Sequence, residues 1–159
     1  MSRCYLDTNF LYVHLRTPRK DPPQPAHSWR ATILEQLGAD TPVTSALVLD
    51  ELAYRLILAW LRDDGERDPL SAYRADATAA MRAVRDRLAK TWRAVDSLAL
   101  ASQPTDDEVV GRAKALMARP GLSPRDAFHA AHALAAGCSL IASTDPVFDQ
   151  VRGLRRLGP

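Results

Sequence analysis

Short apolar runs alternate with longer segments of helical periodicity along this chain. The runs at residues 3–6, 42–44 and 138–142 have the length of buried strands, and helical patterns separate them. Such alternation is typical of α/β proteins that are built on a parallel sheet. It constrains the fold more than any single motif does, because it predicts the strands together with the helices that cover them.

The alternation divides the chain into expected elements. Strands are expected at residues 3–6, 42–44, 94–101 and 138–142, with a fifth at 154–157. Helices are expected at residues 10–15, 26–37, 46–61 and about 70–92. Two more are expected, one from the Thr105–Glu108 capping box to Arg119 and one from Ser123 to Gly137. Segment 17–25 holds four prolines and is expected to be a loop.

The composition is that of a soluble globular protein. The chain has 159 residues, of which 47% are hydrophobic and 25% are charged, so we expect one domain over residues 1–159. Cys4 and Cys138 are its two cysteines, which excludes a disulfide scaffold and a cysteine-based zinc site. No apolar run reaches the ~18–20 residues of a membrane span, and the first residues lack the features of a signal peptide. We therefore expect a cytoplasmic protein that contacts no membrane.

Basic residues gather in one stretch, although the net charge is only +2. Residues 81–93 hold five basic side chains and one acidic one, and 18 of the 21 basic residues of the chain are arginine, the better partner for phosphate oxygens. In this stretch Arg82, Arg85 and Lys90 are candidates for contacts with a nucleic-acid backbone. A solvated helix face in a genome that favours arginine codons explains the same residues without a function.

Four acidic residues occupy positions where an α/β sheet carries its chemistry. They are Asp7 and Asp145, directly after predicted strands, Asp126, in the first turn of a predicted helix, and Glu51, in the second turn of another. Functional groups of open α/β sheets lie beyond the carboxyl ends of the strands, so the four carboxylates can converge there. Such a cluster repels itself unless cations are bound, and carboxylate oxygens favour Mg²⁺ or Mn²⁺ over zinc. A metal held in this way suits the hydrolysis of a phosphodiester.

Each of these acids also has a purely structural explanation. Asp7 can cap a helix, Asp145 can belong to an ordinary turn, and Asp126 suits the dipole at a helix N-terminus. Glu51 and Arg55 have the spacing of a helical ion pair. The helix around Glu51 is apolar around nearly its whole circumference, however, and a carboxylate among apolar side chains is costly without a partner. One shared site explains the four positions better than four coincidences.

Four segments of the chain carry a family resemblance. They are YLDTNFLYVHL at residues 5–15, TSALVLDELAYRL at 44–56, SPRDAFHAAHALAAG at 123–137 and LIASTDPVFDQV at 140–151. In this order, and over nearly the whole chain, they resemble the PIN-domain ribonucleases, and among these the VapC toxins of bacterial toxin–antitoxin pairs. The resemblance implies a three-layer α/β/α sandwich with a central, mostly parallel sheet of four or five strands. It also implies an endoribonuclease site that depends on Mg²⁺ or Mn²⁺.

The resemblance also implies roles for particular residues. The acidic quartet that holds the metal and carries catalysis would be Asp7, Glu51, Asp126 and Asp145. The supporting residues around it would be Asn9, Ser143, Thr144 and His129. Asp50 adjoins Glu51 and is its rival, but neighbours on a helix point about 100° apart, so only one of the two can face the site. The long loop 17–25 and the helical stretch 62–92 depart from a minimal VapC-like chain.

The leading hypothesis is a metal-dependent endoribonuclease that hydrolyses RNA phosphodiester bonds as the toxin of a toxin–antitoxin pair. Its RNA could be a tRNA, an rRNA or an mRNA. Its expected protein partners are a cognate antitoxin and a second copy of the chain in a homodimer. The alternative hypothesis is a catalytically silent PIN fold that serves as an RNA-binding or protein-interaction module. The presence of all four acids favours the enzyme.

Overall fold

The computed structural model describes residues 3–16, 25–37 and 41–159. Within these residues the chain forms a five-stranded sheet whose neighbouring strands are all parallel. The strands are β1 (Cys4–Leu6), β2 (Val43–Ser45), β3 (Ala101–Gln103), β4 (Leu140–Ala142) and β5 (Arg155–Leu157). Their spatial order is β3-β2-β1-β4-β5, so the chain passes over β2 and β1 between β3 and β4.

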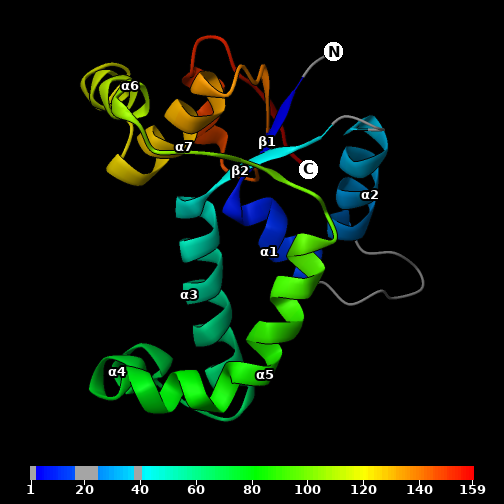
Figure 1. Cartoon of the computed structure of the whole chain (residues 1–159), viewed down its shortest axis with the longest axis vertical. Helices are drawn as coiled ribbons and strands as arrows, with labels where there is room; N and C mark the ends of the chain where they lie inside the picture. Colours follow the sequence, from blue (N-terminus) through cyan, green and yellow to red (C-terminus); the bar gives the residue numbers. More distant parts are fainter. Residues whose placement is uncertain (1–2, 17–24, 38–40) are drawn as a thin grey trace.

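Helices make up most of the rest of the described chain. They are α1 (Thr8–Arg16), α2 (Pro25–Leu37), α3 (Ala46–Asp63), α4 (Pro69–Ala75), α5 (Ala77–Asp96), α6 (Asp107–Ala118), α7 (Pro124–Ala135) and the short 3₁₀ helix η1 (Pro146–Gln150). α7 packs against β2 and β3 and carries α6 outside it, while α1 and α2 lie on the other side of the strands (Figure 1). The predicted α/β/α sandwich around a parallel sheet is thereby confirmed.

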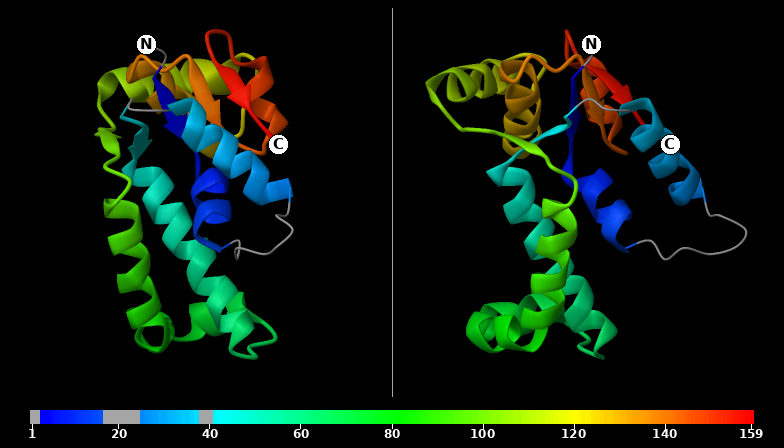
Figure 2. Two further views of the ribbon diagram at one scale, coloured as in Figure 1. Left: turned by 90° about the vertical axis from the view of Figure 1, so that its right-hand side faces the viewer. Right: turned by 45° about the vertical axis from the view of Figure 1, so that its right-hand side comes forward.

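Three helices form an arm that extends from the sheet. α3 and α5 run side by side away from the carboxyl ends of the strands, and α4 lies at their far end (Figure 2). We call residues 46–96, which make up α3, α4 and α5, the arm. α3 begins at Ser45, whose hydroxyl accepts a hydrogen bond from the backbone N–H of Val48 at 3.4 Å. The predicted helical extension at residues 62–92 lies within this arm.

Two predictions along the arm are wrong in their boundaries. Residues 94–96 belong to α5 rather than to a strand, because Val95 continues the buried face of the helix, and the third strand begins only at Ala101. The helix predicted at about 70–92 is divided at Asp76. The carboxylate of Asp76 accepts from the backbone N–H of Ala79 at 2.8 Å and so starts a new helix.

The predicted capping box at the start of α6 is also wrong. Asp106 caps this helix by accepting from the backbone N–H of Val109 at 2.9 Å. The hydroxyl of Thr105 lies 2.9 Å from Nε2 of His132 instead. The proposed loop at 17–25 lies outside the described residues except for Pro25, which begins α2.

The fold gathers buried polar side chains at one end of the sheet. Asp7 follows β1, Ser45 ends β2 and Ser143 follows β4, and all three are buried. Because β1 lies between β2 and β4, the three side chains come from the carboxyl ends of adjacent strands. Among the helices in the described part of the chain, none combines the length and the apolar character that crossing a membrane requires.

Candidate active site

Asp7 is the most deeply buried carboxylate of the predicted quartet. Only 3% of its surface is exposed, and its backbone N–H donates to the carbonyl of Ala142. The Ser143 hydroxyl donates to its Oδ2 at 2.6 Å, and the Asn9 amide donates to the same oxygen at 3.3 Å. Burial raises the pKa of Asp7, while His129 and the hydrogen bond from Ser143 oppose that rise. Two of the predicted supporting residues therefore contact this carboxylate directly.

Glu51 lies in the second turn of α3, and 16% of its side chain is exposed. Its Oε2 accepts from the Thr8 hydroxyl at 3.1 Å, and its Oε1 lies 3.7 Å from the Arg125 guanidinium. Burial by itself would raise the pKa of Glu51, but the interactions with His129, Arg125 and Thr8 outweigh it and lower that pKa. Asp50, the rival candidate, is exposed, so Glu51 is the acid of this helix that faces Asp7.

His129 joins the two carboxylates. It is only 2% exposed and comes from α7, on the opposite face of the sheet from α1. Its Nε2 lies 3.1 Å from Oε2 of Glu51 and 3.9 Å from Oδ1 of Asp7. One imidazole thus lies against two acids that would otherwise repel each other in a buried environment.

The buried hydroxyl groups of Tyr5 and Ser45 orient the His129 ring at Nδ1, the ring nitrogen that does not face Glu51. Oη of Tyr5 lies 2.7 Å from Oγ of Ser45 and 3.5 Å from Nδ1 of His129. The carboxylate of Glu51 can only accept, so Nε2 of His129 donates to it. The Tyr5 hydroxyl lies between Nδ1 of His129 and the Ser45 hydroxyl and can bond to both. These contacts fix the orientation of the imidazole.

Arg55 holds Asn9 instead of forming the helical ion pair with Glu51 that its spacing allows. Its Nη1 donates to Oδ1 of Asn9 at 2.7 Å, and its guanidinium carbon lies 4.6 Å from the centre of the Tyr12 ring. Because the amide oxygen of Asn9 accepts from Arg55, the amide nitrogen faces Asp7 and donates to it. Arg55 therefore positions Asn9 rather than neutralising a carboxylate.

Asp126 and Asp145 lie beside this network rather than within it. Asp126, in the first turn of α7, accepts from the Ser123 hydroxyl at 2.5 Å. Asp145 caps η1, and its backbone N–H donates at 3.1 Å to the Ser143 hydroxyl that contacts Asp7. Among the described residues, no hydrogen bond or ion pair joins either acid to Asp7 or to Glu51.

The remaining predicted residues are exposed. Thr144 adjoins Asp145 in the sequence and lies two residues beyond β4. Arg82 and Arg85 are exposed on α5, where they line the same hollow of the arm. Lys90 does not line that hollow, because at about 100° per residue it points roughly 80–140° away from the two arginines around the helix.

Sequence reasoning did not single out three residues of the network, namely Tyr5, Thr8 and Arg125. Thr8 and Arg125 are sequence neighbours of Asp7 and Asp126, so adjacency to an acid was a usable signal. Tyr5 carries no such signal, because its role depends on the packing of α7 against the sheet.

The chemistry of Asp7 and Glu51 fits a hard divalent cation. Both offer carboxylate oxygens, the ligands that Mg²⁺ and Mn²⁺ prefer. A cation would also relieve the charge of Asp7, which burial disfavours. As the side chains are arranged, no group of three or more His, Cys, Asp or Glu residues within 3–16, 25–37 and 41–159 lies together closely enough to hold a metal.

Comparison with known proteins agrees with this fold. The family model of the PIN domain matches residues 4–154 of the chain. No curated protein is similar enough in sequence to count as a match.

Two solved structures share the arrangement of helices and strands. The crystal structure of VapBC2 from Rickettsia felis, bound to a DNA fragment from their promoter, contains a chain that is 15% identical, with 96% of each chain covered and a TM-score of 0.60. A chain of FitAcB from Neisseria gonorrhoeae is 18% identical, with 90% of this chain and 88% of that one covered and a TM-score of 0.55. At these identities the likeness shows the fold alone.

Proposed function

Since the chain belongs to the PIN domain family, we propose that it is a metal-dependent endoribonuclease that hydrolyses RNA phosphodiester bonds. The observation that carries the proposal is the pair of carboxylates, Asp7 and Glu51, which His129 joins at the carboxyl ends of the parallel strands. Nucleases of this family generally use divalent metal ions. The pair offers the oxygen ligands that such ions need.

The residues of the network prepare the two carboxylates for this task. Ser143 and Asn9 orient Asp7, and Thr8 and His129 orient Glu51. Groups held in advance of the reaction need little reorganisation when charge develops on a phosphate.

The proposed metal ligands are Asp7 and Glu51, completed by Asp126 and Asp145. When bound there, Mg²⁺ or Mn²⁺ would lower the pKa of water and neutralise charge on a phosphoryl oxygen. The exposed Arg125 guanidinium beside Glu51 is placed to bind a phosphate oxygen of the same substrate. The proposed products carry 5′-phosphate and 3′-hydroxyl ends.

We also propose the biological setting that the resemblance implies. The protein would act in the cytoplasm as a single domain over residues 1–159, on a tRNA, an rRNA or an mRNA. Its proposed partners are a cognate antitoxin and a second copy of the chain. Its likeness in fold to chains of VapBC2 and FitAcB supports an antitoxin partner.

Cleavage of RNA by the purified protein tests the proposal. A labelled total-RNA or tRNA pool is incubated with the protein in Mg²⁺, Mn²⁺ or EDTA. We expect discrete fragments with either metal and none in EDTA. Asp7→Asn should slow cleavage by about a thousandfold, the order that one electrostatic or acid–base group contributes.

Glu108→Gln is the matched control for the removal of one carboxylate. Glu108 is exposed on α6 and pairs with Arg112 at 2.7 Å, away from the network, so cleavage should be unchanged. Equal cleavage by the parent and Asp7→Asn would make the site assignment wrong. A folded protein that binds RNA but cleaves nothing in either metal would favour the alternative, a catalytically silent RNA-binding module.

A further inference from the structure

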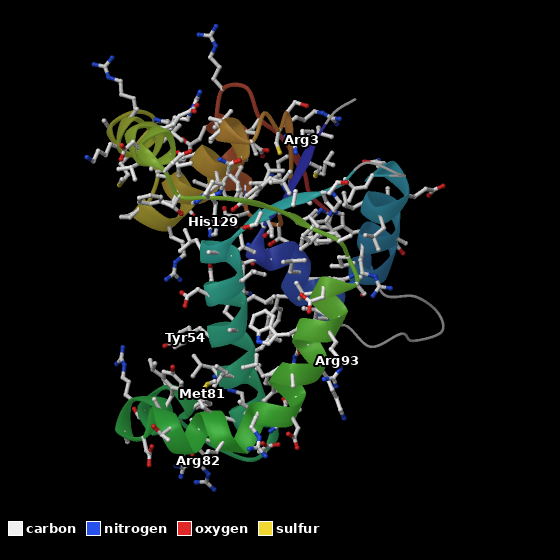
Figure 3. All side chains as sticks on the ribbon, viewed as in Figure 1. Arg3, Tyr54, Met81, Arg82, Arg93 and His129 are labelled. Carbon is white, nitrogen blue, oxygen red and sulfur yellow. The ribbon has the colours of Figure 1, made fainter. Side chains whose placement is uncertain are left out.

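An open groove continues from the candidate site along the arm. It consists of three adjoining hollows of about 490, 530 and 410 Å³. Glu51, Arg125 and Tyr54 line the first hollow, and Met81 lines all three. Figure 3 shows His129, Tyr54 and Met81 in this order from the sheet toward the far end of the arm. The groove therefore begins at a carboxylate of the site and leads away from it.

The floor of the groove is apolar and accessible. Leu88 and Trp92 line the second and third hollows, and Met81 is 37% exposed. These three side chains form one stripe of α5, because their spacing of seven and four residues returns to the same helix face. Trp29 and Trp60 are buried whereas Trp92 is half-buried, so Trp92 is the tryptophan that a ligand in the groove can reach.

Positive charges stand at both ends of the groove. Arg125 lies at the end near the site, and Arg82 and Arg85 line the hollow that is farthest from it. Asp50 lines the first and the second hollow, and Asp96 lines the second. A polyanion bound here would therefore turn uncharged groups toward these acids and hold its charges at the arginines and in solvent.

We propose that this groove binds an unpaired RNA strand that leads into the site. A phosphodiester held near Asp7 and Glu51 has nucleotides on both sides, and the groove that continues from Glu51 offers those on one side a surface to follow. Bases can stack on apolar and aromatic side chains such as Trp92, while arginines at the ends bind phosphates. The inference rests on the proposed function and specifies the form of its substrate.

The composition of the groove favours a single strand over two other ligands. In a duplex the bases are paired and stacked inside, so they could not cover the apolar floor. An acidic peptide would bring carboxylates against Asp50 and Asp96, which line the first two hollows. A single strand can turn its neutral bases toward these acids, because its phosphates lie along the backbone and can face the arginines and the solvent.

Binding measured without cleavage tests the groove. The Asp7→Asn protein in EDTA is titrated into a labelled single-stranded oligoribonucleotide of mixed sequence and into its duplex, and fluorescence anisotropy gives both affinities at several salt concentrations. Trp92→Leu, which keeps an apolar side chain, should weaken single-strand binding about tenfold and duplex binding much less. Arg82→Ala with Arg85→Ala should reduce the slope of log Kd against log salt by about 0.7 for each lost phosphate contact.

Lys114→Ala is the control, since it removes an exposed charge from α6, which does not line the groove. It should change neither the single-strand affinity nor the salt slope. Both arginines are exposed, so the double variant tests the proposal even if Trp92→Leu misfolds. Unchanged single-strand binding in the double variant, or equal losses for duplex and single strand in Trp92→Leu, would overturn the proposal. So would a change of oligomeric state in the groove variants with RNA binding intact, which would identify a protein contact surface.

Failure here and failure of the proposed function give different results. If the protein binds RNA through the groove but cleaves none, the proposed hydrolysis is refuted and the proposed RNA-binding groove is supported. If cleavage depends on metal but the groove variants bind and cleave RNA like the parent, the proposed hydrolysis is supported and the proposed RNA-binding groove is refuted.

Discussion

The carboxylate site and the groove of the arm share Glu51 but are built in opposite ways. The site is made of side chains that are mostly buried, from the end of β1, from α3, from α7 and from the end of β4, and hydrogen bonds fill the spaces between them. The far part of the groove is made of exposed or half-buried side chains from the single helix α5. Long-range contacts therefore set the properties of the site, whereas local helical periodicity sets those of the groove.

The two carboxylates show what this dependence on partners means. Asp7 and Glu51 face the same imidazole, yet the pKa of Asp7 is raised and that of Glu51 is lowered. Burial dominates at Asp7. At Glu51, which is less buried, His129, Arg125 and Thr8 outweigh the effect of burial. The fact that both residues are carboxylic acids does not predict that their pKa values shift in opposite directions.

After the loss of Asp7 itself, the largest expected effect comes from a variant that disrupts the site and leaves the groove intact. His129→Gln removes the ring that joins Asp7 and Glu51, and we expect cleavage to fall about 10- to 100-fold, as for loss of a residue that orients metal ligands. RNA affinity in EDTA should stay the same, because His129 does not line the groove. Single-turnover rates and anisotropy measure the two quantities separately.

His132→Gln is the control for this variant. His132 is buried on the same helix but bonds to Thr105 and to the Phe128 carbonyl. Its cleavage rate per folded molecule should match that of the parent. Equal losses in the two variants would mean that His129 acts through the packing of α7 and not through the carboxylates.

A smaller effect concerns stability, where the two carboxylates should respond in opposite directions. The folded state raises the pKa of Asp7, so its charge costs stability above that pKa, and the cost disappears as the pH falls below the unfolded value. Asp7→Asn should therefore raise Tm at pH 8 by about 3–6 °C, which corresponds to ~1–2 kcal/mol for a chain of this length. The gain should shrink as the pH is lowered, and thermal melts across the pH range measure it.

Glu51→Gln should do the reverse. The folded state lowers the pKa of Glu51, so its charge contributes stability above the unfolded value, and this contribution is lost as the pH falls through the folded value. We expect Tm to fall by about 2–3 °C at pH 7 and the difference to vanish in acid. Changes of the same sign in Asp7→Asn and Glu51→Gln would contradict the opposite shifts.

The smallest expected effect is the change in Tm caused by variants in the arm. Arg82→Ala with Arg85→Ala should leave Tm within about 2 °C of the parent, because exposed side chains without buried partners contribute within ~0.5 kcal/mol. Arg87→Ala on the same helix should lower Tm, since Arg87 pairs with Asp64 and lies 5.6 Å from the centre of the Trp60 ring. A large loss of stability in the double variant would show that these arginines hold the arm together.

The predictions made from sequence succeeded at two helix starts that are decided locally. Ser45 and Ser123 start α3 and α7 as predicted, because an N-cap requires only a side chain and the backbone of the next turn. The third strand was misplaced because Val95 has the same apolar character in a buried helix face as in a strand. The division at Asp76 was missed because the helical pattern continues on both sides of it.

The sequence by itself determined the parallel α/β architecture and placed four acids at the ends of its elements. Only the tertiary structure decided which of them meet. His129 reaches Glu51 across 78 residues of chain, and Arg55 reaches Asn9 across 46. Both contacts arise when β1 takes its place between β2 and β4 and α7 packs beside them. Periodicity and capping act within a few residues, whereas hydrogen bonds in a buried network depend on elements that approach one another only in the folded chain.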